Sequence, residues 1–277
     1  MAALQVITGG TSGMGLDTAR ALAAYGPVFI GGRSEKRLAD ALAILKEAGV
    51  EAYGKPCDVS DLQSVQEFAQ AAQEIAPIGN VVNAAGVDFD TSTNEQMVRI
   101  NMLGVVNVIE TFLPLMSEGT LLSFSSITGY TSYAPDPDDI EIWNDATSPD
   151  FVEKCLQNIA KRPNPMPGRL PDEYIAYAAS KRFVMYYTMA NASRFGARGL
   201  RILSIAPGSF NTPMLATQKE YLASIAAGTA FKRVGEPEEM AALIQAVLDP
   251  KISYLTGCDI VMDGGKMAMG MIKQIQP

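Results

Sequence analysis

Short apolar runs alternate with longer amphipathic segments along most of the chain. The apolar runs predict strands at Leu4–Ile7, Val28–Ile30, Val50–Tyr53, Gly79–Asn83, Thr120–Ser125, Leu200–Ile205 and Asp259–Met262. The segments between them predict helices at Gly13–Tyr25, Glu35–Ala48, Asp61–Ile75, Thr93–Met116, Glu173–Phe195 and Glu238–Val247. Strands that alternate with helices form right-handed βαβ units, and continuously apolar strands are buried on both faces. The pattern predicts an α/β fold with a doubly wound parallel sheet of about seven strands and helices on both faces.

The segment 130–172 interrupts this alternation. It is rich in proline, contains Trp143 as the only tryptophan of the chain, and carries only acidic charges over residues 136–153. Loops of this length inside a compact domain are usually functional or disordered. Within it, Phe151–Ala160 is expected to form a short helix. We interpret residues 1–277 as a single domain in which this insertion forms either a lid over a site or an interface element.

The composition limits the classes of function. The chain has 277 residues and a net charge of −8, without a dense block of lysine and arginine, which argues against a nucleic-acid partner. Because the chain has no histidine and Cys57, Cys155 and Cys258 lie far apart, we expect neither a metal site nor a disulfide framework. We expect no signal peptide, no membrane partner and a cytoplasmic location, since the apolar runs are too short to span a bilayer.

Tyr177 and Lys181 stand four residues apart and therefore share one face of a predicted helix. An ammonium beside a phenol stabilises the phenolate and lowers the tyrosine pKa from its reference of about 10. Such a tyrosine can donate and accept a proton at a carbonyl or hydroxyl group. The pair matters because the chain lacks histidine, the usual acid/base near neutral pH. Alone, however, this spacing is common by chance.

A glycine-rich loop follows the first strand and opens the first helix. It reads Thr8-Gly9-Gly10-Thr11-Ser12-Gly13-Met14-Gly15. Glycines let the backbone approach a phosphate closely, and the helix N-terminus adds N–H donors and a favourable dipole. The preceding strand and the following helix are the context that a dinucleotide-binding loop requires. The loop thus indicates a Rossmann-type sheet.

Together these motifs resemble the short-chain dehydrogenase/reductase family. In chain order they are Gly9-x3-Gly13-x-Gly15, Asp58-Val59, Asn83-Ala84-Ala85-Gly86, Asn101, Ser126, Tyr177-x3-Lys181, Pro207-Gly208, Leu255-Thr256-Gly257 and Asp263-Gly264-Gly265. The resemblance covers nearly the whole chain apart from the insertion and the last dozen residues. It implies an enzyme that interconverts a ketone and a secondary alcohol on a small molecule, with a nicotinamide cofactor.

The resemblance also implies a role for each matching residue. Tyr177 would be the acid/base, Ser126 would hydrogen-bond the reacting oxygen, and Lys181 would hold the nicotinamide ribose. Asn101 would hold a water that joins Lys181 to solvent, Asn83 would brace the central strands, and Ser125 is the alternative to Ser126. The expected cofactor contacts are Gly9, Thr11, Ser12, Gly13, Met14, Gly15, Arg33, Ser34, Asp58, Val59, Asn83, Ala84, Ala85, Gly86, Tyr177, Lys181, Pro207, Gly208 and Thr212.

The end of the second strand bears on the choice between NADP(H) and NAD(H). It reads Gly31-Gly32-Arg33-Ser34, without the acidic residue that would bind the ribose 2′-hydroxyl of NAD. The Arg33 guanidinium instead suits a 2′-phosphate. NADP(H) is therefore favoured. NAD(H) stays open because NADP-preferring members often carry a basic residue where this chain has Ser12.

Three features point to finer functional interpretations. The long insertion before Tyr177 resembles that of bacterial 3α-hydroxysteroid dehydrogenase/carbonyl reductase, which suggests a steroid or another apolar cyclic substrate. Apolar residues within Pro213–Ala230 suggest a substrate lid. In addition, Tyr174 and Lys181 match the wider tyrosine–lysine spacing of enoyl reductases, although the Ser126 motif fits carbonyl reduction better.

Two further alternatives remain from the sequence. A 3-oxoacyl-carrier-protein reductase would need a basic docking surface, which this acidic chain does not obviously provide. A non-catalytic NADP(H)-sensing protein would commonly lack one of the four residues Asn101, Ser126, Tyr177 and Lys181, all of which are present. A homodimer or homotetramer is expected, because members of the family assemble through the helices here predicted at 93–116 and 173–195.

Overall fold

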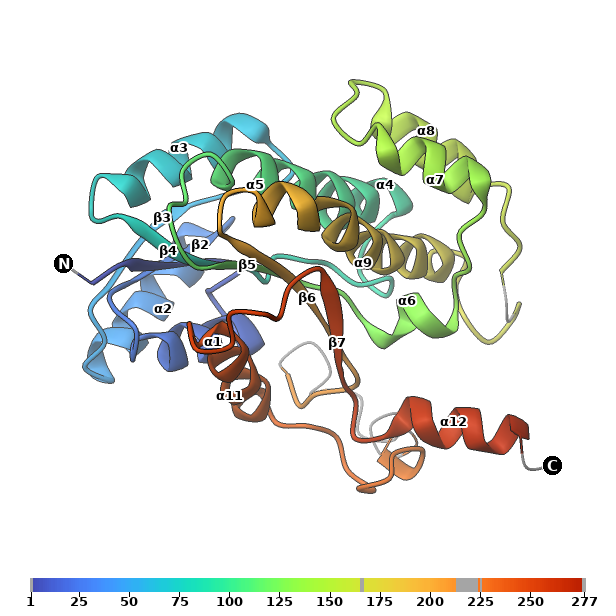
Figure 1. The fold of residues 1–277 in the computed structure, drawn as a ribbon. Helices are drawn as coiled ribbons and strands as arrows, with labels where there is room; N and C mark the ends of the chain where they lie inside the picture. The colour runs from blue at the N-terminus through green and yellow to red at the C-terminus, as the bar shows by residue number, and fades with distance from the viewer. Residues whose placement is uncertain (1, 165–166, 213–223, 225, 276–277) are drawn as a thin grey trace.

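The centre of the protein is a single parallel sheet. A computed structural model describes residues 2–164, 167–212, 224 and 226–275. Seven strands run in the order β3-β2-β1-β4-β5-β6-β7 (Figure 1). The strands are β1 (Leu4–Thr8), β2 (Val28–Gly32), β3 (Ala52–Pro56), β4 (Ile78–Asn83), β5 (Thr120–Phe124), β6 (Arg201–Pro207) and β7 (Cys258–Met262). The predicted fold class, a Rossmann-type doubly wound sheet, is confirmed.

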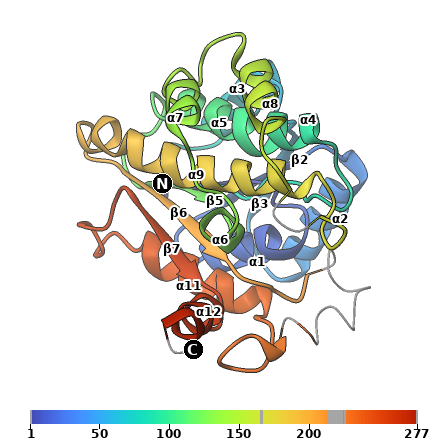
Figure 2. The same ribbon diagram turned by 90° about the vertical axis from the view of Figure 1, so that its right-hand side faces the viewer.

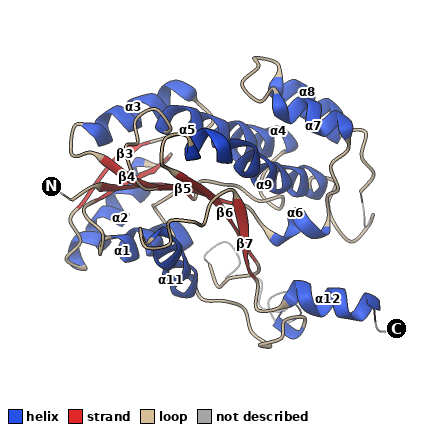
Figure 3. Ribbon diagram, viewed as in Figure 1, coloured by secondary structure: helices blue, strands red, loops and turns tan. Residues whose placement is uncertain are grey.

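Helices cover both faces of this sheet, which lies as a layer between them in Figure 3. One face carries α1 (Gly13–Leu22), α2 (Glu35–Glu47) and α11 (Pro237–Leu248). The other carries α3 (Leu62–Gln73), α5 (Gly104–Phe112) and α9 (Tyr174–Gly196). A hydrophobic cluster lies on each side, and the central strands β1, β4, β5 and β6 are buried along their whole length. Within the described part of the chain, no helix is long and apolar enough to cross a membrane.

The helix predicted at Thr93–Met116 is shorter and less regular than expected. It consists of α4 (Asn94–Met97), a π-helical turn η1 (Val98–Leu103) and α5. It ends before Pro114, which lacks an N–H group and restricts the preceding residue. Wider turns of this kind recur at functional sites. Here the turn contains Asn101.

Other differences from the predicted elements have local causes. β3 runs from Ala52 to Pro56 because each of its residues pairs with one of β2, from Val28 to Gly32. Within the described residues, the helices that the sequence did not predict are α6 (Ile127–Thr131), α7 (Pro137–Asn144) and α12 (Lys266–Ile275). The expected lid over Pro213–Ala230 lies mostly outside the described residues.

The insertion folds mainly as a helical pair. α8 (Phe151–Ile159) matches the expected short helix and follows α7. The pair packs on the outer side of α9 (Figure 2), where the Trp143 and Phe151 rings lie 5.7 and 5.5 Å from the Phe183 ring. The buried Asp139 carboxylate holds the insertion together. It accepts hydrogen bonds from Tyr133, Asn158 and Arg162 at 2.8, 2.8 and 2.6 Å. The pair therefore supports α9 from outside, whereas Tyr130, Thr131 and Leu170 from the segment line the cleft described next.

Candidate active site

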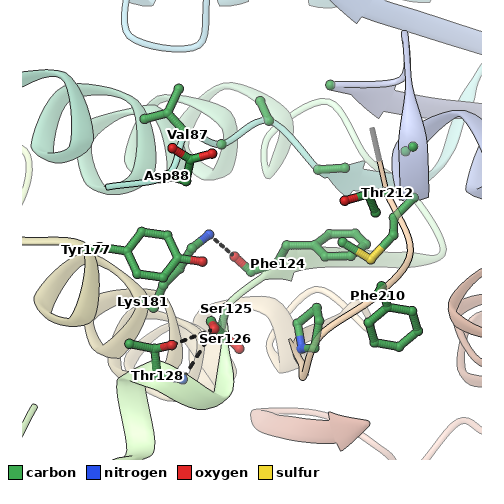
Figure 4. Close-up of a pocket in the computed structure, with 18 of the residues that line it drawn as sticks. Val87, Asp88, Phe124, Ser125, Ser126, Thr128, Tyr177, Lys181, Phe210 and Thr212 are labelled. Carbon is green, nitrogen blue, oxygen red and sulfur yellow. Dashed lines mark hydrogen bonds between the residues drawn. The ribbon is translucent and has the colours of Figure 1, made fainter. Parts of the chain in front are cut away.

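A deep cleft opens at the carboxyl ends of the parallel strands, where ligands of doubly wound sheets bind. Its volume is about 1280 Å³, which exceeds the roughly 300–1,000 Å³ typical of a single small-molecule site. Figure 4 shows part of the cleft, where Tyr177 and Lys181 from α9 face the end of β5. All of the predicted site residues line it except Asn83 and Asn101. The cleft therefore has room for a dinucleotide and a second molecule.

The glycine loop forms one wall of the cleft. Gly9 and Gly13 have φ angles of +67° and +51°, which favour glycine. A Cβ on Gly9 would lie 2.5 Å from the Ala85 nitrogen, and a Cβ on Gly15 would clash with the Gly9 carbonyl oxygen. The loop thus lies tightly against the end of β4, and α1 begins with its N-terminus at the cleft.

Asn83 supports this wall from behind. It is buried, and its side-chain oxygen accepts a 2.6 Å hydrogen bond from the Thr8 hydroxyl. The bond joins the ends of β1 and β4, which carry the glycine loop and the Ala84–Gly86 segment. Asn83 thus braces the central strands as expected, and although it was placed among the cofactor contacts its side chain does not line the cleft.

The end of the cleft beside β2 is basic. Arg33, Ser34 and Arg37 line it, and the Ser34 hydroxyl caps α2 by accepting a 3.3 Å hydrogen bond from the Arg37 nitrogen. Arg37 was not among the predicted contacts, but its position in the first turn of α2 brings it to the cleft. Asp58 and Val59 line the same region, and Asp58 accepts a hydrogen bond from the Ser60 hydroxyl at 2.7 Å.

The Lys181 ammonium lies at the opposite end. It donates a 3.1 Å hydrogen bond to the Phe124 carbonyl at the end of β5, and it lies 5.6 Å from the centre of the Tyr177 ring. Burial lowers the pKa of Lys181 from its ordinary value of 10.5 to about 8. In Figure 4 the Tyr177 hydroxyl and the Lys181 ammonium point into the same space. A helix turn has thus placed a phenol and a cation together, as the four-residue spacing implied.

The two neighbouring serines differ in their contacts. Ser125 lies 2.9 Å from the Ile205 carbonyl and 2.6 Å from the Asp259 carboxylate, so its hydroxyl joins β5 to β6 and β7. Ser126 is the N-cap of α6, and its hydroxyl contacts only Thr128 among the described residues, at 3.3 Å. Hydrogen bonds of 3.3 Å are long. The Ser126 hydroxyl is therefore the better placed of the two to bind a substrate oxygen.

Asn101 lies behind the cleft rather than in its wall. It exchanges hydrogen bonds of 2.9 and 3.0 Å with the backbone of Val87, and its amide donates to the Ser180 hydroxyl at 3.2 Å. A Cβ on Gly86 would lie 3.4 Å from the Asn101 side-chain oxygen and 3.6 Å from the Lys181 side-chain nitrogen. Asn101 thus holds the loop after β4 against α9, the helix that carries Lys181.

An aromatic cluster borders the Tyr177 side of the cleft. The Phe89 ring lies 5.4 Å from the Tyr177 ring and 5.1 Å from the Tyr174 ring. The Tyr174 hydroxyl is 2.8 Å from the Ser132 hydroxyl. Tyr174 is the first residue of α9 and lines the cleft. Phe89 was not predicted, and its only signal in the sequence is its position three residues after the Asn83–Gly86 motif.

Comparisons with known proteins identify the family. A model described as short chain dehydrogenase matches residues 4–135, and one described as Enoyl-(Acyl carrier protein) reductase matches residues 168–266. Short-chain dehydrogenase/reductase bsc3 of Alternaria brassicicola is 32% identical over an alignment of 274 positions that covers 94% of each chain. The chain belongs to the short-chain dehydrogenase/reductase family. The segment between the two matches falls within the insertion.

A further relative and a solved structure with the same fold are also similar to this chain. The 3-hydroxyacyl-CoA dehydrogenase type-2 of Drosophila melanogaster is 30% identical over an alignment of 283 positions that covers 96% of this chain and 98% of the relative. A crystal structure of actinorhodin polyketide ketoreductase with NADPH has a TM-score of 0.76 and 24% identity, over 96% of this chain and 97% of that one. As a short-chain dehydrogenase/reductase, the protein is an oxidoreductase that acts on CH–OH groups with a nicotinamide cofactor.

The structure fits such a cofactor at three places. Gly9 and Gly15 leave no room for a Cβ, which keeps the loop compact where a pyrophosphate would approach. Ser12 makes no side-chain capping bond to α1 within the described chain, so the first-turn N–H groups face the cleft. Arg33 and Arg37 supply positive charge at the β2 end.

The buried Lys181 ammonium generates a prediction about stability and pH. Its pKa is lower in the folded chain than the ordinary 10.5, so between about pH 8 and 10.5 the unfolded chain binds more protons. Stability therefore rises with pH in this window, by up to about 1.4 kcal/mol per pH unit for one group. Lys181→Met removes this dependence. Urea unfolding at pH 7 to 10 gives the free energy of unfolding of both proteins. Between these pH values, we expect the free energy of wild type to rise by roughly 2–3 kcal/mol relative to that of the variant. A difference between the two proteins that does not change with pH would contradict a desolvated ammonium.

Proposed function

We propose that the protein is an NADP(H)-dependent ketone reductase that also runs as a secondary-alcohol dehydrogenase, with an apolar cyclic substrate. One observation supports this most strongly. The Tyr177 and Ser126 hydroxyls and the Lys181 ammonium gather at one end of a cleft whose other end holds the glycine loop and two arginines. Proton transfer and dinucleotide binding would thus share one space.

Each side chain has a defined task in this proposal. When bound, the nicotinamide supplies the hydride in reduction and accepts it in oxidation. The Ser126 hydroxyl donates to the substrate oxygen, where negative charge develops. The Tyr177 hydroxyl gives its proton to that oxygen in reduction and takes it back in oxidation. The Lys181 ammonium stabilises the phenolate form of Tyr177 and would hold the ribose hydroxyls.

The remaining cofactor contacts are proposed by position. Gly13, Met14 and Gly15 would bind the pyrophosphate through the α1 N-terminus, and Asp58 and Val59 would contact the adenine. At the other end Pro207, Gly208 and Thr212 would pack against the nicotinamide, since they line the cleft beside β6. Asn101 would order a water next to Lys181 that reconnects the ammonium to solvent.

The preference for NADP(H) rests on the basic β2 end of the cleft. Arg33 and Arg37 present two guanidinium groups there, and planar guanidinium groups bind phosphate in a bidentate manner. The adjoining segment Gly31–Ser34 carries no carboxylate that would repel a 2′-phosphate.

The assembly and location belong to the same proposal. We infer a cytoplasmic homo-oligomer, because family members are commonly oligomeric and Cys57 and Cys155 are buried free thiols. The thiols suit a reducing compartment. Whether the insertion serves as a lid or an interface stays a prediction. Its α7–α8 pair lies on the outer side of α9.

Tyr177→Phe tests the catalytic proposal. The variant keeps the ring that contacts Phe89 but loses the proton that reaches the substrate oxygen. We expect kcat for ketone reduction to fall by at least a hundredfold, with the NADPH dissociation constant changed less than about threefold. Stopped-flow turnover and nicotinamide fluorescence provide the two values. Retained turnover would remove Tyr177 from the mechanism, and absence of turnover in wild type would favour a binding protein.

Arg33→Ala tests the cofactor preference, with Lys36→Ala as its control. Lys36 is basic and adjacent in sequence but pairs with Asp40 at 2.9 Å on the exposed side of α2. Loss of a charge-assisted phosphate contact costs about 1.5–3 kcal/mol, or roughly ten- to a hundredfold in affinity. We expect this loss for NADPH and almost none for NADH. Equal effects on both cofactors, or an equal effect of Lys36→Ala, would contradict the assignment.

A further inference from the structure

The C-terminal helix α12 forms a wall of the cleft that the family motifs do not include. Its start is fixed to the end of β7, because the Asp263 carboxylate accepts hydrogen bonds from the Gly265 and Met267 nitrogens at 2.8 and 2.7 Å. β7 is the last strand of the sheet, next to β6. The helix therefore starts at the same carboxyl edge of the sheet as α6, which lies near it in Figures 1 and 2 and which Ser126 caps.

One face of α12 borders the cleft. The lining residues are Lys266, Met267, Gly270 and Met271, whose spacing places them on adjoining rows of the helix surface. Met267 packs against a small buried cluster that includes Ile127, the residue that follows Ser126. This face thus begins beside the proposed oxygen-binding hydroxyl and continues outward to Met271, which is 60% exposed at the mouth.

Gly270 is unusual on this face. Glycine weakens a helix interior relative to alanine, yet the backbone of Gly270 is not in the left-handed region that would favour glycine. A Cβ at this position would meet no atom of the described residues within 4 Å. Neither a turn nor close packing with the described protein explains the glycine. The space in front of it belongs to the cleft.

The surroundings of that space are apolar and adaptable. Met267 and Met271 flank Gly270 along the helix, and unbranched methionine side chains adjust to irregular ligands. The cleft also has the Phe89 and Tyr174 rings in its lining. Its volume of about 1280 Å³ leaves room for a second molecule beside a dinucleotide. An apolar ring system would bury surface against both methionines only if position 270 carried no side chain.

We propose that Gly270 is a specificity-determining residue, and that the apolar ring body of the substrate lies across it between Met267 and Met271 of α12. This inference rests on the proposed ketone reductase activity and assigns its substrate class: ketones with a bulky apolar ring system. The carbonyl end of the substrate lies at Tyr177 and Ser126. The ring body extends from there along α12.

Gly270→Leu fills this space without displacing the described protein, and Gly270→Ala fills it in part. Ala268→Leu is the matched control, because Ala268 is exposed on the same helix and does not line the cleft. The bulky probe is Prodan, a naphthyl ketone whose emission reports binding without turnover, and the small ketone is butanone. Circular dichroism verifies that each variant is folded.

We expect Gly270→Leu to weaken Prodan binding at least tenfold. The ratio of kcat/KM for Prodan over butanone, with NADPH, should fall by the same factor. Gly270→Ala should weaken binding about twofold while raising the melting temperature, and Ala268→Leu should match wild type. Unchanged binding in Gly270→Leu, an equal loss in Ala268→Leu, or no Prodan binding to wild type would each overturn the proposal. If wild type binds Prodan in this pattern but reduces neither ketone, the proposed activity fails while the α12 site stands.

Discussion

The hydrogen bond between the buried Lys181 ammonium and the Phe124 carbonyl joins the two parts of the candidate active site. Lys181 lies on α9, whereas Phe124 ends β5 and precedes the two serines. Burying an ammonium is costly unless its hydrogen bonds are satisfied. The position of α9 in which Lys181 reaches the Phe124 carbonyl is therefore favoured. One turn earlier on the same helix, Tyr177 is thereby directed to the space that Ser126 borders. The desolvation that lowers the pKa of Lys181 is thus a consequence of the geometry that aligns the catalytic groups.

Packing on both sides of α9 maintains that alignment. On the cleft side, a Cβ on Gly129 would lie 2.8 Å from the Arg182 nitrogen, so α6 and α9 touch through their backbones. On the outer side, Trp143 of the insertion packs against Phe183. Because Ser126 caps α6, its hydroxyl is fixed relative to α9 as well. The insertion therefore contributes to the site through support, apart from its ends, which line the cleft.

The sequence was sufficient for those parts of the molecule that depend on local spacing. Strand and helix alternation predicted the sheet, and the Tyr177–Lys181 spacing predicted their common orientation. Contacts between distant segments were not predictable, since they depend on tertiary packing. The role expected for Asn101 stays a prediction, whereas its hydrogen bonds to Val87 and Ser180, which join the loop after β4 to α9, could not be read from the sequence. The position of α12 was missed for the same reason. The helix reaches the cleft because Asp263, just after β7, fixes its first turn, and the sequence of the helix itself carries no motif.

The most direct test of the account follows a deuterium atom from the cofactor to the product. NADPH deuterated at the transferred position of its nicotinamide C4 would be incubated with the protein and a cyclic α,β-unsaturated ketone, and the product examined by nuclear magnetic resonance. The account predicts deuterium on the former carbonyl carbon of an allylic alcohol. Deuterium on the β-carbon of a saturated ketone would instead show an enoyl reductase. Bound NADPH with no transferred deuterium to this or any other ketone would contradict catalysis by Tyr177 altogether.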